Sequence, residues 1–254
     1  MSPTRPSLAQ LVNMVRPNTL RYEQGSASWF KRRRVWAVPI IAAGNLVMWA
    51  AGQPIITAIT PSGWHTWERA GYDALHSGLA QATPDAQGGL WMTAMPGRSL
   101  KEERALDAAL LRAIGAELSR AHRCRVEGRA FRHGDPHLGN FTYCQDTQRA
   151  YLIDFETRYL KRLDEDQGQI EDLFVLLLDL AGRATTDEQA QRWSGSALEG
   201  YGGGAPKQAL IKRLLREAWW LERVFLSSRA HELPWRVLRT RLEAIAEALL
   251  SAPA

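Results

Sequence analysis

Cysteine is scarce in this chain, with Cys124 and Cys144 the only two among 254 residues. They lack the paired spacing that a zinc site needs, and two cysteines cannot build the disulfide framework of a small secreted domain. A zinc-finger protein and a disulfide-rich secreted domain are therefore excluded. The two cysteines indicate a reducing compartment, where each is expected to be a small buried hydrophobe.

The excess of positive charge is also small. Lys and Arg number 32 against 27 Asp and Glu, which gives a net charge of +5. No basic stripe alternates with aromatic side chains as in nucleic-acid-binding modules, so nucleic acid is not an expected partner. The mild positive charge is compatible with polyphosphate or with an anionic membrane surface. The hydrophobic content of 45% and charged content of 23% are those of a globular protein.

A glycine-rich phosphate loop is missing as well. Gly25 stands alone near the start of the chain, and the Tyr-Gly-Gly-Gly run at 201–204 lacks the Lys-Ser/Thr pair of a P-loop. A P-loop nucleotide-binding protein is therefore excluded, and a bound nucleotide would need another cover. The first ten residues have no apolar core behind Arg5, so no signal peptide is predicted.

Charged side chains are absent from residues 35–67. The first part of this stretch is about as long as the shortest membrane-spanning helix, and the basic run at 31–34 precedes it. A proline, a glycine and an asparagine within it weaken that interpretation. Three alternatives stay open: a buried or half-exposed insertion, a peripheral membrane contact from Val35 to Trp49, and a spanning helix.

What the chain does contain is a polar constellation in its middle. Residues 132–141 are Arg-His-Gly-Asp-Pro-His-Leu-Gly-Asn-Phe, with Asp135 and Asn140 five positions apart. Asp154 follows an apolar run and opens the sequence Asp-Phe-Glu. Phosphoryl transfer needs such a set. One carboxylate orients and deprotonates the attacking hydroxyl, while an amide oxygen and a second carboxylate hold Mg²⁺ against the nucleotide phosphates.

This spacing resembles the protein-kinase-like superfamily, whose catalytic loop reads H-x-D-x-x-x-x-N and whose metal aspartate opens D-F-G. Here the loop is H-G-D-P-H-L-G-N, the metal segment is D-F-E, and no A-P-E follows. These variants look more like the atypical branch, which holds aminoglycoside and choline phosphotransferases and bacterial lipopolysaccharide (Kdo/heptose) kinases. The resemblance implies an α+β, protein-kinase-like two-lobe fold. Residues 1–95 would form a small β-rich N-lobe with an apolar insertion at about 35–60, and residues 96–254 a mainly helical C-lobe, together one catalytic unit.

The resemblance also implies roles for the central residues, with ATP and Mg²⁺ as cofactors. Asp135 would be the catalytic base or hydroxyl-positioning acid, and Asn140 and Asp154 would bind Mg²⁺. His137 stands where protein kinases place a lysine, and it could contact the γ-phosphate or only fill space. His133 is expected to pack and to hydrogen-bond the loop rather than to react.

Upstream, residues 19–34 predict a β-hairpin with its turn at 23–26. The resemblance makes Lys31 the strand lysine that binds nucleotide phosphates, and Glu68 its ion-pair partner on a helix that starts near Pro61. Each has a simpler alternative: Lys31 could begin a solvated basic run, and Glu68 could complement a helix dipole. Backbone groups at about 93–95 would meet the adenine ring.

Downstream, the apolar periodicity predicts a helical region. A capping box of Ser99 and Glu102 would start the first helix. In the buried helix that follows the central motifs, Asp172 is expected to bind the backbone of the catalytic loop, because a buried acid needs such partners. The expected helices cover residues 99–124, 170–180, 207–226 and 233–250, with a glycine-rich linker at 200–204. Residues 1–18 are expected to be a helical or irregular lead-in.

The sequence thus predicts an ATP- and Mg²⁺-dependent kinase that phosphorylates a hydroxyl of a sugar or lipid-linked sugar, with a small molecule or glycolipid as partner. The resemblance implies a cytoplasmic location, and the peripheral alternative adds contact with the inner face of the cytoplasmic membrane. Two other functions stay open, a protein Ser/Thr kinase and a non-catalytic pseudokinase that acts as a binding scaffold. The missing glycine loop favours the scaffold, while the complete set of Asp135, Asn140 and Asp154 opposes it.

Overall fold

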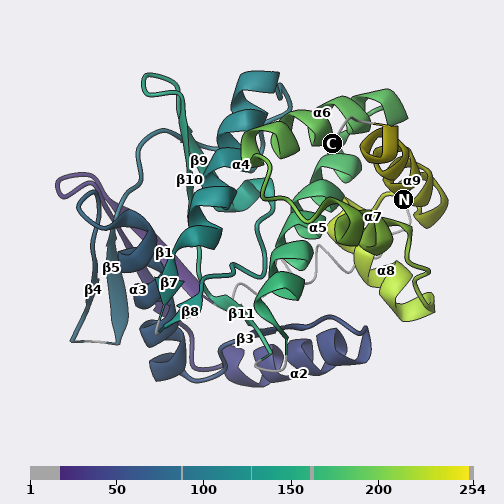
Figure 1. The fold of residues 1–254 in the computed structure, drawn as a ribbon. Coiled ribbons are helices and arrows are strands. Elements are labelled where there is room, and N and C mark those ends of the chain that lie inside the picture. The colour runs from purple at the N-terminus through teal and green to yellow at the C-terminus, as the bar shows by residue number, and fades with distance from the viewer. Residues whose placement is uncertain (1–17, 87, 127, 161–162, 252–254) are drawn as a thin grey trace, which may run out of the picture.

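The computed structural model describes residues 18–86, 88–126, 128–160 and 163–251. Apart from Asn18, the helical or irregular lead-in expected over residues 1–18 lies outside the described residues. The described chain combines helices with small antiparallel sheets, an arrangement compatible with the predicted two-lobe fold. In Figure 1 the first sheet lies on one side of the molecule and the helices of the second half gather on the other.

The first sheet has the strand order β1-β2-β5-β4. Its first two strands form the predicted hairpin, which places Leu20 opposite Lys31. Because β2 pairs with β1 on one side and β5 on the other, Lys31 stands in an interior strand. The strands of this sheet are β1 (Asn18–Glu23), β2 (Ser28–Arg33), β4 (Ala82–Pro84) and β5 (Gly89–Thr93).

Three smaller antiparallel sheets complete the strands of the described residues. One has the order β10-β9-β6, one pairs β11 with β3, and one pairs β7 with β8. Their strands are β3 (Ile55–Thr57), β6 (Arg98–Ser99), β7 (Arg125–Val126), β8 (Arg129–Ala130), β9 (Phe141–Cys144), β10 (Arg149–Leu152) and β11 (Thr157–Tyr159).

Four of the α-helices in the described part of the chain begin at capping side chains that satisfy free backbone N–H groups. Thr60, Asp107, Asp164 and Thr186 each accept a hydrogen bond from the backbone three residues ahead. The helices are α2 (Ala37–Ala50), α3 (Pro61–His76), α4 (Ala108–Arg123), α5 (Glu165–Arg183), α6 (Asp187–Tyr201), α7 (Lys207–Leu215), α8 (Trp220–Arg229) and α9 (Trp235–Ser251), with a short 3₁₀ helix η1 (Leu138–Asn140).

The core is continuous between the sheets and the helices. α5 is its most buried helix, as the apolar run at 170–180 predicted. The large side chains that are almost fully buried include Trp64, Phe131, Phe141, Phe155 and Phe174. Most of these lie next to the predicted catalytic residues in the chain, so the core sits directly behind the polar constellation.

The apolar stretch after the basic run forms α2, which lies along the lower edge of the view in Figure 1. Among the described residues no helix is both long and apolar enough to cross a membrane, so the spanning alternative is wrong. Only Ala37 and Ile41 of α2 are buried. The helix therefore agrees with a half-exposed insertion, and membrane contact stays a prediction.

Two predicted helices have different limits. The capping box of Ser99 and Glu102 is wrong, because Ser99 pairs with Thr142 of β9 and the helix begins only after Asp107. The single helix predicted over 207–226 is interrupted between α7 and α8. There the guanidinium of Arg239 donates to the carbonyls of residues 214, 215 and 216, which ends α7 by satisfying its last acceptors.

Candidate active site

The loop from His133 to Asn140 connects β8 to β9 and rests on α5. The carboxylate of Asp172 accepts from the backbone N–H of His133 at 2.8 Å and of Gly134 at 2.7 Å. Asp179 accepts from the N–H of Leu138 at 2.9 Å. The predicted bond from Asp172 to the loop is therefore confirmed, and a second carboxylate of the same helix holds the far end of the loop.

His133 connects this loop to the segment that carries Asp154. Its Nδ1 accepts from the N–H of Asp135 at 3.1 Å, so the proton is on Nε2, which donates to the carbonyl of Ile153 at 3.0 Å. Burial lowers the pKa of His133, which keeps the ring neutral. The N–H of Ile153 in turn donates to the carbonyl of Asn140 at 2.8 Å. Both ends of the loop are thus bonded to the residue before Asp154.

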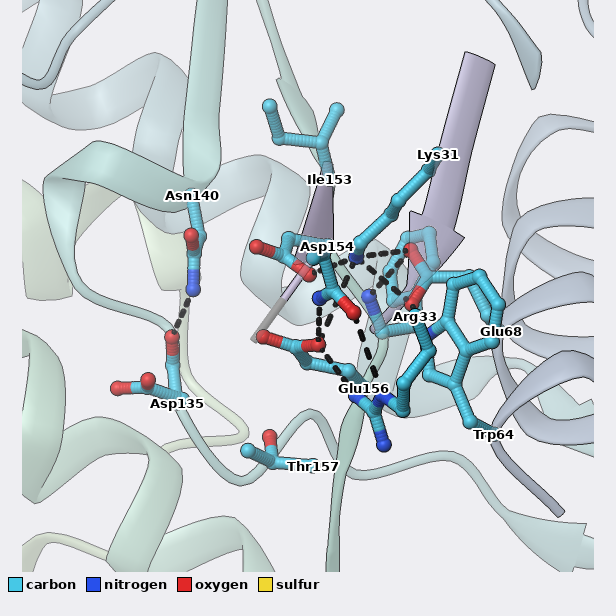
Figure 2. A network of polar contacts seen from close by, with 12 residues as sticks. Lys31, Arg33, Trp64, Glu68, Asp135, Asn140, Ile153, Asp154, Glu156 and Thr157 are labelled. Atoms are coloured by element: carbon cyan, nitrogen blue, oxygen red, sulfur yellow. Dashed lines mark hydrogen bonds and ion pairs between the residues drawn. The ribbon is translucent and has the colours of Figure 1, made fainter. Parts of the chain in front are cut away.

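Lys31 lies at the centre of a buried group of charges (Figure 2). Its Nζ donates to both carboxylate oxygens of Glu68, at 3.1 and 3.0 Å, and to Oδ1 of Asp154 at 2.6 Å. The carboxylate of Glu156 lies 3.8 Å away. The structure thus brings Lys31 and Glu68 together as predicted, and it adds Asp154 to the pair.

The protonation of this group follows from burial and from these neighbours. Burial by itself lowers the pKa of Lys31, but the carboxylates of Asp154, Glu68 and Glu156 together raise it, so the lysine is charged. Burial raises the pKa of Glu68 to about 7 against the opposing pull of Lys31. For Asp154 the attraction of Lys31 outweighs burial and lowers the pKa, so this carboxylate is ionised.

Glu68 is fixed by further donors. Trp64 Nε1 donates to it at 3.1 Å and the backbone N–H of Phe155 at 3.3 Å. Asp154 itself has a φ of 68°, the left-handed region that few residues other than glycine adopt. Backbone in this region is strained and persists only where its surroundings impose it, as they do at functional sites. Here Lys31 and the bonded residues on either side impose it.

Arg33 continues the charged group on the same face of β2. Its Nη2 donates to Glu156 at 2.7 Å, its Nε to Asn18 at 3.2 Å, and its Nη1 to the carbonyl of Ala58. The basic run 31–34 is therefore split by strand alternation: Lys31 and Arg33 are buried, and the arginines at 32 and 34 are exposed. The simpler alternative of a wholly solvated run is wrong for Lys31.

Asp135 lies apart from this group, beside Asn140 in Figure 2. The guanidinium of Arg229, from the end of α8, donates to its Oδ1. His137 Nε2 is 3.8 Å from its Oδ2, while His137 Nδ1 accepts from the N–H of Gly139 at 3.0 Å. His137 thus caps η1 and faces Asp135.

Among the described residues, the side chain of Asn140 is bonded through its nitrogen. Its Nδ2 donates to the backbone carbonyl of Asp135 at 2.8 Å, which orients the amide and leaves Oδ1 as an acceptor. An amide oxygen and a carboxylate are ligands that suit Mg²⁺. Carboxylate oxygens of Glu68, Asp154 and Glu156 also lie within 4.8 Å of one another. Of these three, Asp154 has the most exposed side chain, at 37%, so it is the one that can turn an oxygen to a metal ion.

A cleft of about 820 Å³ opens on the Asp135 side of the site. Asp135 and His137 line it together with Arg229 and His231, whereas Lys31 and Asp154 do not. Further lining residues come from the segment 101–104 and from α5, among them Asp179 and Arg183. The cleft therefore lies where a molecule could approach Asp135.

At the predicted adenine position, backbone groups are already in use. The N–H of Thr93 donates to the carbonyl of Gln81 at 3.0 Å, and the N–H of Ala94 donates to that of Ala27 at 2.8 Å. The carbonyl of Thr93 accepts from the hydroxyl of Tyr72. Contact of this segment with adenine stays a prediction.

No protein-family model matches this chain, and no curated protein does either. Among solved structures, one with similarity is described as WaaP in complex with acyl carrier protein. The identity is 13%, the alignment covers 89% of this chain and 92% of that chain, and the TM-score is 0.34. A likeness this weak carries no argument about function, so the site has to be interpreted from its own geometry.

Proposed function

We propose that this chain is an ATP- and Mg²⁺-dependent phosphotransferase, a kinase that moves the γ-phosphate to a hydroxyl of a sugar or lipid-linked sugar. The observation that carries the proposal is the bonding of Lys31 to both Glu68 and Asp154, at a site whose catalytic-loop residues are bonded to the same segment. Three distant parts of the chain converge there on a set of groups that phosphoryl transfer uses.

The residues on the nucleotide side fit a phosphate-bearing ligand. Lys31 is a charged donor in an interior strand, and Glu68 keeps it in place from α3. Asn140 Oδ1 and the Asp154 carboxylate would hold Mg²⁺, which when bound neutralises charge that builds up on the phosphates. The backbone of the turn around Gly25 would cover the nucleotide, because the first sheet has no glycine-rich phosphate loop.

On the acceptor side, Asp135 would orient and deprotonate the attacking hydroxyl. Arg229 holds one of its oxygens, which leaves Oδ2 to accept the proton of an acceptor hydroxyl in the cleft. The hydroxyl oxygen would then bond to the γ-phosphorus as the bond to the β-phosphate oxygen breaks, and ADP leaves. Because ATP is a cytoplasmic substrate, the proposal includes a cytoplasmic location.

The test is a phosphate-transfer screen with ATP and Mg²⁺ over free sugars, lipid-sugar fractions and generic protein substrates. Wild type should transfer phosphate to a sugar-containing acceptor. Asp135→Ala should lower turnover by about 10²–10⁴-fold, the range that a positioned acid or base contributes. Asp154→Ala should abolish turnover, because it removes a proposed Mg²⁺ ligand. Circular dichroism should show that both variants stay folded.

A matched control is Asp166→Ala, which removes an exposed carboxylate of α5 outside the site. Its turnover should equal that of wild type. A wild-type protein that binds no Mg-ATP and phosphorylates none of the acceptors would refute the enzyme and leave the scaffold. Transfer to the proteins alone would instead favour a protein kinase.

A further inference from the structure

Large apolar side chains stand exposed along α2 and at the start of α8. We call this set the α2–α8 face. Leu46, Trp49 and Trp220 are the most exposed of its helical members, at 63%, 60% and 69%. The ends of the two helices meet, since the indole nitrogen of Trp219 lies 3.9 Å from where a side chain on Gly52 would begin. The face consists of Val35, Trp36, Ile40, Leu46, Val47, Trp49, Trp219, Trp220 and Val224.

The position of α2 conflicts with its composition. A helix with no charged residue is normally buried on all sides, yet α2 is buried only at Ala37 and Ile41. It is held along one side, where the amide of Asn45 donates to the carbonyl of Thr57 and accepts from its N–H, both at 2.9 Å. An apolar helix attached on one side and bare on the other indicates a partner for the bare side.

The residues at the border of the face indicate the chemistry of that partner. Arg32, in β2, and Arg34 lie five and three residues before α2, and both are exposed. The guanidinium of Arg34 lies over the ring of Trp36, 5.4 Å from its centroid. Cations next to tryptophan, at the edge of the apolar helix α2, which has no acidic residue, suit the headgroup level of an anionic bilayer. At the α8 end of the face the exposed Glu217 stands between the exposed Arg216 and Arg223 in the chain. A protein partner would instead be expected to meet a mixed polar rim.

We propose that the α2–α8 face binds the surface of an anionic lipid bilayer, with α2 lying in the membrane plane. At 14 residues α2 is about 21 Å long, shorter than the ~30 Å hydrocarbon layer, so it lies on the membrane rather than across it. The face joins the outer end of α8, and the inner end of α8 carries Arg229 into the cleft. Delivery of a lipid-linked acceptor to Asp135 would rest on the proposed function, whereas membrane binding does not.

The experiment is flotation of the purified full chain with two kinds of vesicle, phosphatidylcholine alone and phosphatidylcholine with phosphatidylglycerol. Wild type should float with the anionic vesicles and less well at high salt. The double variant Leu46→Glu/Trp49→Glu should lower the partition coefficient by at least about tenfold. Arg32→Ser and Arg34→Ser should each lower it by about fivefold, on anionic vesicles only.

The matched control is Leu250→Glu, because Leu250 of α9 is as exposed as Leu46, at 64%. It should float like wild type, and thermal unfolding should show that every variant is folded. Failure of wild type to float would overturn the proposal, as would unchanged flotation of the double variant. The proposal would also be overturned if wild type formed dimers instead of binding vesicles and the double variant did not. A second copy of the chain would then cover the face.

Discussion

Glu156 stands two residues after Asp154 and belongs to the same buried group of charges as Lys31 and Arg33. Its Oε2 accepts from Arg33 at 2.7 Å and from Asn18 at 2.6 Å. The side chain of Arg33 is 0% exposed, so its charge depends on this carboxylate. Glu156 therefore fastens the Asp154 segment to β1 and β2. A glutamate there ties the segment to both strands of the first hairpin through these two bonds.

Removing Glu156 should destabilise the protein strongly. We expect Glu156→Ala to lower the free energy of unfolding by about 3 kcal/mol, the lower end for a broken buried pair, since Glu156 is itself 21% exposed. Urea denaturation measures this. The control Glu199→Ala removes the exposed partner of Arg112 and should cost less than about 1 kcal/mol. If Glu156→Ala lowered the free energy of unfolding no more than the control does, the stabilising role of the Arg33–Glu156 pair would be contradicted.

At the level of single residues, the sequence predicts some of the side chains of the site and misses others. Lys31 and Glu68 could be paired because a known family supplied their roles. Arg33 was missed, although its position two residues after Lys31 on a strand puts both on one face. Arg229 could not have been found, because it reaches Asp135 across 94 positions and follows no local pattern.

α5 organises the catalytic loop from beneath. Asp172 and Asp179 are seven residues apart, which is about two helical turns, so both carboxylates lie on one side of the helix. Asp172 also accepts from the hydroxyl of Tyr159 at 2.7 Å and bonds His122 Nε2 at 3.0 Å. Burial would raise the pKa of Asp172, but His122 and its other partners lower it, so the carboxylate is ionised. One helix thereby fixes the loop at both ends.

Replacing Asp172 should free the loop as well as weaken the fold. Asp172→Ala leaves the N–H groups of His133 and Gly134 without their acceptor, and we expect the free energy of unfolding to fall by about 3–5 kcal/mol. Hydrogen exchange should show that these amides lose protection more than those of β10. Asp166→Ala, on the exposed first turn of α5, should leave exchange in the loop unchanged. Equal protection in both variants would show that Asp172 does not hold the loop.

Helices and hairpins whose limits depend on local pattern were predicted well, including β1–β2, α5 and the role of Asp172 in it. The errors came from contacts between distant residues. β6 takes Ser99 into a sheet with β9, and Arg239 of α9 ends α7. Neither partner lies near the affected segment in the chain, so local pattern could not show them. The division into lobes near residue 95 stays a prediction.

Across the whole molecule, three buried histidines connect segments that are far apart in the chain. His76 Nε2 lies 2.8 Å from the carbonyl of Leu152, His122 lies between Asp172 and Tyr201, and His133 bonds the carbonyl of Ile153. Burial lowers the pKa of all three below the ordinary value of 6.5. The folded protein therefore keeps them neutral at a pH where the unfolded chain binds protons.

The stability of the protein should consequently fall as the pH drops below about 6.5. In that window the unfolded state binds more protons than the folded state, and acid then shifts the equilibrium toward unfolding. Glu68 acts in the opposite direction, because its raised pKa of about 7 lets the folded state bind a proton that the unfolded chain releases above its ordinary value of 4.5. Because three histidines lower the stability on acidification and one glutamate raises it, the net effect is a loss of stability. The lowered pKa values of Asp154, Asp172 and Asp179 add to that loss below about pH 4.

Thermal unfolding between pH 8 and pH 5 in steps, at constant ionic strength, measures this dependence. His122→Gln should flatten the decline, because it removes one of the three titrating groups while an amide can still donate to Asp172. Glu68→Gln should steepen it, because it removes the one group that opposes the histidines. A melting temperature that stays constant or rises on acidification, or a decline that His122→Gln leaves unchanged, would show that these buried rings do not control the acid stability of the fold.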